Sequence, residues 1–109
     1  MKAYIAGKIT GDQDYRNKFN IGQQALEHEG FIVLNPADLP EGMRPADYMR
    51  ICFAMIDSAD IVAFLPDWAN SRGAALENDY CQYTGKTTLY LESFTSYQNL
   101  INPCIGIGF

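Results

Sequence analysis

The sequence is poor in the residues that build metal centres and disulfide frameworks. It contains three cysteines, Cys52, Cys81 and Cys104, with no C-x-x-C pair, and one histidine, His28. An odd number of scattered cysteines cannot form a closed set of disulfides, and a single histidine beside them argues against a zinc cluster. We therefore expect reduced, buried thiols in a cytoplasmic protein that binds no metal.

Basic residues and long apolar runs are also scarce. The chain has eight Lys and Arg residues and 13 Asp and Glu residues, which gives a net charge of −5. This balance argues against a nucleic-acid polymer as partner, because neutralising phosphates requires a basic face; a small anionic ligand is still compatible with it. No apolar run approaches the length of a membrane span, and the first expected strand begins at Lys2. We expect neither a signal peptide nor a membrane partner.

The residues that are present predict one α/β domain over positions 1–109. The hydrophobic content of 48% indicates a globular chain with a single core. Strand-like runs alternate with helical patterns: strands at 2–6, 31–34, 61–65 and 87–91, and helices at 14–29, 46–58 and 74–83. This alternation predicts a Rossmann-like or flavodoxin-like three-layer sandwich with about four or five mostly parallel strands. The strand order cannot be read from these patterns.

The stretch from Asp60 to Tyr90 contains the main candidate residue, Glu77. It combines a strand, a loop (PDWANSRG) and a helix that Gly85 ends. Parallel sheets bind ligands at the carboxyl ends of their strands. We expect Glu77 in the first turn of the helix, where a carboxylate can act as a nucleophile at an anomeric carbon. The alternative is a glutamate that only favours the helix dipole, typically worth about 0.3–1 kcal/mol.

The loop before this helix offers candidate substrate-binding residues. Ser71 and Gly73 can present a hydroxyl and a backbone N–H to a phosphate, or Ser71 can be an ordinary N-cap. Trp68 can stack on a base or ribose, or act as a hydrophobic lid. Arg72 is a candidate phosphate donor because it lies in the same loop.

The loop after the first strand, GKITG, is a second candidate binding segment. Its glycines allow the backbone to turn tightly and to approach a ligand, although a plain strand-to-helix turn has the same composition. The candidate substrate-binding residues here are Gly7, Lys8 and Ile9.

Three segments, YIAGKITG, NPADLP and DIVAFLPDWANSRGAALENDYCQYTGK, resemble the nucleoside 2-deoxyribosyltransferase superfamily. The likeness is strongest to a branch of small bacterial and phage proteins that is similar to the nucleoside 5′-monophosphate N-glycosidases. It covers most of residues 2–91 and leaves 93–109 poorly matched. It implies that Glu77 attacks C1′ without a cofactor and that Tyr4 orients the carboxylate or the sugar. It also implies that Gly7, Ser71 and Gly73 hold the 5′-phosphate.

The sequence departs from that pattern at two positions. The phosphate-binding arginine falls at Thr10, so that Lys8 or Arg72 would have to replace it. The aspartate that serves as general acid falls at or beside Cys52, and a thiol is a poor proton donor near neutral pH. Asp47 and Asp67 are the candidate replacements.

The combined expectation is an N-glycosidase that hydrolyses a (deoxy)nucleoside 5′-monophosphate. Two alternatives stay open: a nucleotide-binding module without turnover, and a deoxyribosyltransferase that exchanges bases between nucleosides. Base exchange is disfavoured because deoxyribosyltransferases tend to carry an aspartate at the position of Ser71. The resemblance further implies a homodimer or higher homo-oligomer in the cytoplasm of a bacterial or phage-infected cell.

Overall fold

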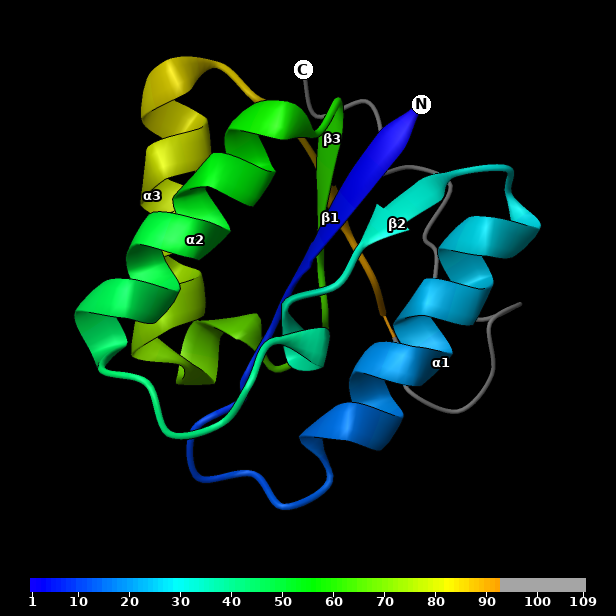
Figure 1. Cartoon of the computed structure of the whole chain (residues 1–109). Coiled ribbons are helices and arrows are strands. Elements are labelled where there is room, and N and C mark those ends of the chain that lie inside the picture. The colour runs from blue at the N-terminus through cyan, green and yellow to red at the C-terminus, as the bar shows by residue number, and fades with distance from the viewer. Residues whose placement is uncertain (93–109) are drawn as a thin grey trace.

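A computed structural model describes residues 1–92, and Figure 1 shows the arrangement of the elements. The strands are β1 (Lys2–Ala6), β2 (Ile32–Leu34), β3 (Ile61–Phe64) and β4 (Thr87–Tyr90). The helices are α1 (Tyr15–His28), α2 (Pro45–Ser58) and α3 (Arg72–Thr84), with 3-10 turns at Pro36–Asp38 and Trp68–Asn70. The expected alternation of strands and helices is confirmed. The poorly matched segment 93–109, including Cys104, lies outside the described residues.

The four strands form one parallel sheet in the order β2-β1-β3-β4. Tyr4 of β1 is in register with Leu34 of β2 and with Val62 of β3, so β1 is paired on both sides. This order is that of the flavodoxin-like folds, in which the chain reverses direction across the sheet between β1 and β3. Ligands of such folds bind outside the carboxyl ends of these two strands.

Helices cover both faces of the sheet and give it three layers. Figure 1 shows α1 on one face and α2 with α3 on the other. Because neighbouring side chains of a strand point to opposite faces, Ala3 and Ile5 join the core on the α1 side. Tyr4 and Ala6 join the core beneath α2 and α3. A sheet buried on both faces explains why the strands are almost continuously apolar.

Helix α3 begins two residues earlier than its apolar pattern predicts. Ser71 is the N-cap, and its side chain accepts a hydrogen bond of 3.2 Å from the Ala74 N–H. Gly85 ends the helix in the left-handed conformation with φ of 78°. Because Arg72 is the first helical residue, Glu77 lies in the second turn, and its expected place in the first turn is wrong. The dipole effect falls off within the first turn, so it does not account for Glu77.

The loops that follow β1, β2 and β3 gather at one edge of the sheet, the lower edge in Figure 1. This is the carboxyl edge because all strands are parallel. The loop after β1 contains Gly7 to Asp14, and the loop after β3 contains Leu65 to Ser71. Both segments that the sequence marks as candidate binding loops therefore meet at the same edge.

Candidate active site between helix α3 and strand β1

Glu77 is a carboxylate that the fold buries between α3 and the sheet. The Tyr4 hydroxyl donates a hydrogen bond of 2.5 Å to Glu77 Oε2, across 73 positions of sequence. Tyr4 is fully buried and Glu77 is only 5% exposed. Ala74, Glu77 and Cys81 are the buried residues of α3, because the helical repeat turns them toward the sheet. The packing of α3 on β1 thus brings Glu77 and Tyr4 together.

Burial controls the ionisation of this pair. It raises the pKa of Glu77 from its ordinary value of 4.5 to about 7, and the hydrogen bond from Tyr4 opposes that rise. The pKa of Tyr4 is raised well above 10.0, first by burial and then by the charge of Glu77. Tyr4 therefore remains a hydrogen-bond donor, while Glu77 is present in both ionised and neutral forms near neutral pH. A carboxyl group in this state suits nucleophilic or acid–base chemistry.

Cys52 of α2 lies beside the same pair. It is buried in the cluster that contains Tyr4, and both the Tyr4 hydroxyl and the Glu77 charge act on its thiol. Burial is the main cause that raises the pKa of Cys52 to about 11. The thiol stays protonated near neutral pH and is a weak acid toward a departing base. Cys52 and Cys81 are free and buried, which confirms the expectation for these two cysteines.

Ser71, Arg72 and Gly73 form the start of α3 at the carboxyl edge. The Ser71 hydroxyl caps the helix, which agrees with the second of its two predicted roles, an ordinary N-cap. Arg72 is exposed. A Cβ atom built on Gly73 would meet nothing closer than Met49 Sδ at 3.9 Å and Ser71 Oγ at 4.0 Å. A Cβ atom there would make only ordinary van der Waals contacts, so the Gly73 backbone is not crowded, and the first turn of a helix leaves N–H groups free for an anion.

The loop after β1 is held against the loop after β3. A Cβ atom on Gly7 would lie 2.7 Å from Leu65 Cδ1 and 3.0 Å from Leu65 Cβ, so a larger residue there would force Leu65 or the backbone to shift. The Lys8 N–H donates a hydrogen bond of 3.2 Å to Asp67 Oδ1. Ile9 packs against the core on the α1 side. Each of these residues therefore has a structural contact in addition to its predicted role in substrate binding.

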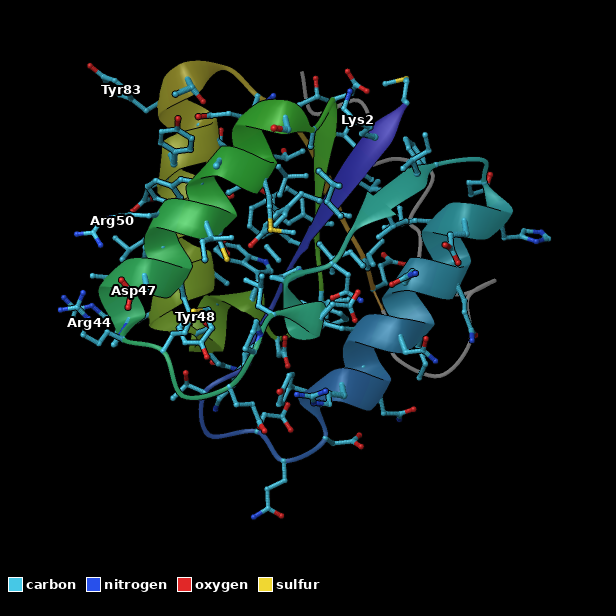
Figure 2. All side chains as sticks on the ribbon, in the orientation of Figure 1. Lys2, Arg44, Asp47, Tyr48, Arg50 and Tyr83 are labelled. Atoms are coloured by element: carbon cyan, nitrogen blue, oxygen red, sulfur yellow. The ribbon has the colours of Figure 1, made fainter. Side chains whose placement is uncertain are left out.

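The two aspartates proposed as replacement acids are occupied elsewhere. Asp47 pairs with Arg44 at 3.2 Å and with Arg50 at 3.3 Å. Figure 2 shows these three side chains on the outer side of α2, away from the sheet. Asp67 contacts the Lys8 N–H and lies 3.6 Å from Lys18 Nζ. No contact joins either aspartate to Glu77 within the part of the chain that the structure describes.

Trp68 packs in the hydrophobic cluster beneath α2 and α3. Its ring lies 5.4 Å from that of Phe64 in a T-shaped contact and 5.7 Å from that of Tyr90. The side chain is half-buried. These contacts match the hydrophobic-lid interpretation, and the exposed part leaves room for a second role in stacking.

Sequence analysis missed Lys18, which reaches Asp12 and Asp67 from α1. Lys18 Nζ lies 2.6 Å from Asp12 Oδ2 and 3.6 Å from Asp67 Oδ2. Its position one residue before the buried Phe19 marked it only as part of an amphipathic helix. No local pattern could have found these contacts, because they depend on how α1 and the loop after β3 are placed by the sheet.

The fold and the site define a class: an α/β protein with a flavodoxin-like strand order and a buried, tyrosine-bound carboxylate. Within residues 1–92, no group of three His, Cys, Asp or Glu side chains could hold a metal ion, and no helix is long and apolar enough to cross a membrane. A family described as a domain of unknown function, DUF4406, matches residues 1–90. The chain belongs to this family. A search of curated proteins gives no match.

Proposed function

We propose that this protein is an N-glycosidase that hydrolyses a (deoxy)nucleoside 5′-monophosphate to free base and sugar 5-phosphate. The observation that carries the proposal is the Glu77 carboxylate, buried beside β1 and hydrogen-bonded by Tyr4. A surface carboxylate at this point of α3 would need no such partner. The sequence resemblance to the nucleoside 2-deoxyribosyltransferase superfamily names the same two residues.

The chemistry requires two displacements at one carbon. A Glu77 oxygen attacks C1′, the N-glycosidic bond breaks, and its electron pair leaves with the base, which takes up a proton. Water then attacks C1′ of the glycosyl ester, which releases the sugar 5-phosphate and restores the Glu77 carboxylate. The Tyr4 hydroxyl holds the attacking group in place and lowers its pKa, so that more of it is ionised near neutral pH.

The start of α3 supports a phosphate at the other end of the substrate. The uncrowded backbone at Gly73 and the N–H groups of the first turn suit an anion. Lys8 and Arg72 are the nearby cations in sequence, and they stand in for the arginine that is replaced by Thr10. A 5′-phosphate bound there would fix the position of the sugar relative to α3.

A second candidate is a module that binds a nucleotide without cleaving it. The observation that favours it is that residues 1–92 offer no evident acid: Cys52 is buried with a pKa of about 11, and Asp47 is paired with two arginines. Without a proton donor, the departure of the base is slow. The nucleotide would remain bound at the same site.

Free base release separates these candidates. Wild type and Glu77→Gln are incubated with ribo- and deoxyribonucleoside 5′-monophosphates and with the matching nucleosides, and products are separated by liquid chromatography. We expect wild type to release base from a monophosphate, and Glu77→Gln to be slower by at least roughly a thousandfold, as for other enzymes that lose a nucleophile. The matched control is Asp79→Asn, an exposed carboxylate on the same helix, which should leave the rate unchanged.

Each other outcome points to a different conclusion. Equal rates for wild type and Glu77→Gln would exclude Glu77 as the nucleophile. Formation of a new nucleoside when a second base is added would indicate base exchange. No base from any compound, together with a nucleotide that raises the melting temperature, would support the binding module.

We further propose that the protein is a cytoplasmic homodimer or higher homo-oligomer with a small-molecule nucleotide or nucleoside as its ligand. The free, buried thiols of Cys52 and Cys81 suit a reducing compartment. Leu76 and Tyr83 are two turns apart on α3, and both are exposed, Tyr83 by 93%. Figure 2 shows Tyr83 projecting outward from the end of α3. Apolar side chains repeated on an outer helix face suit contact with a second subunit.

A further inference from the structure

Three charged side chains form a largely buried cluster between α1 and the carboxyl edge of the sheet. Lys18 Nζ of α1 lies 2.6 Å from Asp12 Oδ2 and 3.6 Å from Asp67 Oδ2. The side chains of Lys18, Asp12 and Asp67 are 26%, 13% and 14% exposed. Asp12 precedes α1 in the loop after β1, and Asp67 belongs to the loop after β3. The cluster therefore links the two candidate binding loops.

The remaining carboxylate atoms of the cluster bind the backbone of the same loops. Asp67 Oδ1 accepts a hydrogen bond of 3.2 Å from the Lys8 N–H, and Asp12 Oδ1 accepts one of 2.9 Å from the Asp14 N–H. Asp67 Oδ2 is buried without a hydrogen bond and has Lys18 as its nearby cation. The position of the Lys8 backbone is thus set by Asp67, and the charge of Asp67 is balanced by Lys18.

Stability alone is a poor explanation for this cluster. The three side chains keep 13–26% of their surface exposed, and ion pairs that are only partly removed from water typically add little stability. The cluster also combines two carboxylates with one ammonium group at an edge where the proposed ligand is an anion. Lys18 supplies the positive charge that offsets part of the negative charge of the two aspartates there.

We propose that Lys18 is a positioning residue for the anionic end of the substrate. Through Asp67 and Asp12 it holds the loop that contains Gly7 and Lys8 against the loop that leads to Ser71, and its single positive charge offsets one of the two negative charges beside them. The role in substrate binding rests on the proposed function. The role in holding the loops does not, because it follows from the contacts alone.

The test compares Lys18→Met and Lys18→Arg with wild type and with Lys86→Met. Lys86 is a matched control, because it is also half-buried and its Nζ donates a hydrogen bond of 2.6 Å to the Ala59 carbonyl at the opposite edge of the sheet. Four quantities are measured: the exchange rate of the Lys8 amide by NMR, KM and kcat for the monophosphate that wild type cleaves best, and the melting temperature of each variant.

We expect Lys18→Met to accelerate exchange of the Lys8 amide and to raise KM, each by about tenfold, the size of effect expected when a hydrogen bond to a charged group is weakened. The kcat value should change less than KM, because Glu77 and Tyr4 are on the other face of the sheet. Lys18→Arg should recover part of both effects, and Lys86→Met should show neither.

The two proposals fail in different ways. If Lys18→Met leaves the Lys8 exchange rate and KM at their wild-type values, the role of Lys18 is overturned while the glycosidase stands. If wild type cleaves and binds no nucleotide while Lys18→Met still accelerates Lys8 exchange, the proposed function fails and Lys18 remains the residue that holds the two loops. A fall in melting temperature equal to that of Lys86→Met, without either specific effect, would leave only an ordinary structural lysine.

Discussion

Glu77 couples the stability of the fold to its ionisation. The residue is 5% exposed, and its pKa of about 7 lies well above the ordinary value of 4.5. The folded protein therefore keeps a proton on Glu77 at pH values where the unfolded chain has lost it. Ionised Glu77 destabilises the fold, and the fold tolerates it because the Tyr4 hydroxyl supplies a hydrogen bond.

The raised pKa of Glu77 predicts how the free energy of unfolding depends on pH. Below about pH 4.5 both states are protonated, and Glu77 contributes no difference. As the pH rises from about 4.5 to about 7, the folded state binds more protons than the unfolded state, so the contribution of Glu77 to stability falls, by about 3 kcal/mol in total. The Glu77→Gln variant does not have this loss, because glutamine does not ionise. Its free energy of unfolding relative to wild type should therefore increase as the pH rises from 5 to 8.

Chemical denaturation at a series of pH values measures the effect. Asp79→Asn is again the control, because Asp79 is exposed. A stability difference between wild type and Glu77→Gln that stays constant from pH 5 to pH 8 would show that the pKa of Glu77 is not raised.

The residues of the site differ in how far sequence could predict them. The N-cap Ser71 and the C-terminal Gly85 could be assigned from local signals, since a helix start and a helix end have recognisable residues. The turn that contains Glu77 was misplaced, because Ser71 caps the helix before its apolar pattern begins. The contact of Lys18 with Asp67 could not be predicted from the sequence. The strand order decides whether α1 lies next to the loop after β3, and local sequence patterns do not give that order.

At the scale of elements, two glycines of the candidate site have different physical roles. Gly7 ends β1 where it packs against Leu65, and a Cβ atom there would lie 2.7 Å from Leu65 Cδ1. Gly73 lies in the first turn of α3, where a Cβ atom would have its nearest neighbours at 3.9 and 4.0 Å. The sequence could show that both are glycines in expected loops, but not that a Cβ atom would clash at Gly7 and make only ordinary contacts at Gly73.

Alanine substitutions should therefore have opposite effects on stability. Gly7→Ala forces Leu65 or the end of β1 to move and should destabilise the fold by roughly 1–3 kcal/mol. Gly73→Ala fits the space and favours the helix, and it should be neutral or stabilising by up to about 1 kcal/mol. Urea denaturation of both variants gives the comparison. A loss of stability for Gly73→Ala as large as that for Gly7→Ala would contradict the packing argument.

The strand order is also a property of elements that local sequence does not contain. The alternation of strands and helices sufficed to predict a parallel sheet covered on both faces. The placement of β1 between β2 and β3 needed the structure, because every strand here is short and apolar. That placement decides which loops meet, and hence which residues can share a ligand.

At the scale of the whole molecule, the outer face of α3 is the surface to test for self-association. Light scattering after gel filtration should give a mass of at least two chains for wild type. Tyr83→Glu should shift the protein toward the monomer, because burying a carboxylate at an interface is costly. Gln24→Glu places the same charge on the exposed side of α1 and should leave the mass unchanged. A monomeric wild type would exclude the homo-oligomer.

The central position of β1 implies that the backbone of the sheet and the loops at its carboxyl edge open on different timescales. The Tyr4 backbone is paired with β2 and β3, and amides of such strands exchange with solvent only when the whole domain unfolds. The loops at the carboxyl edge lie outside the sheet and can open at a much lower free energy. Under the proposed function, a ligand would enter and leave through loop openings while the buried carboxylate keeps its hydroxyl partner. The Tyr4 side of the hydrogen bond is therefore held in place for as long as the sheet is folded.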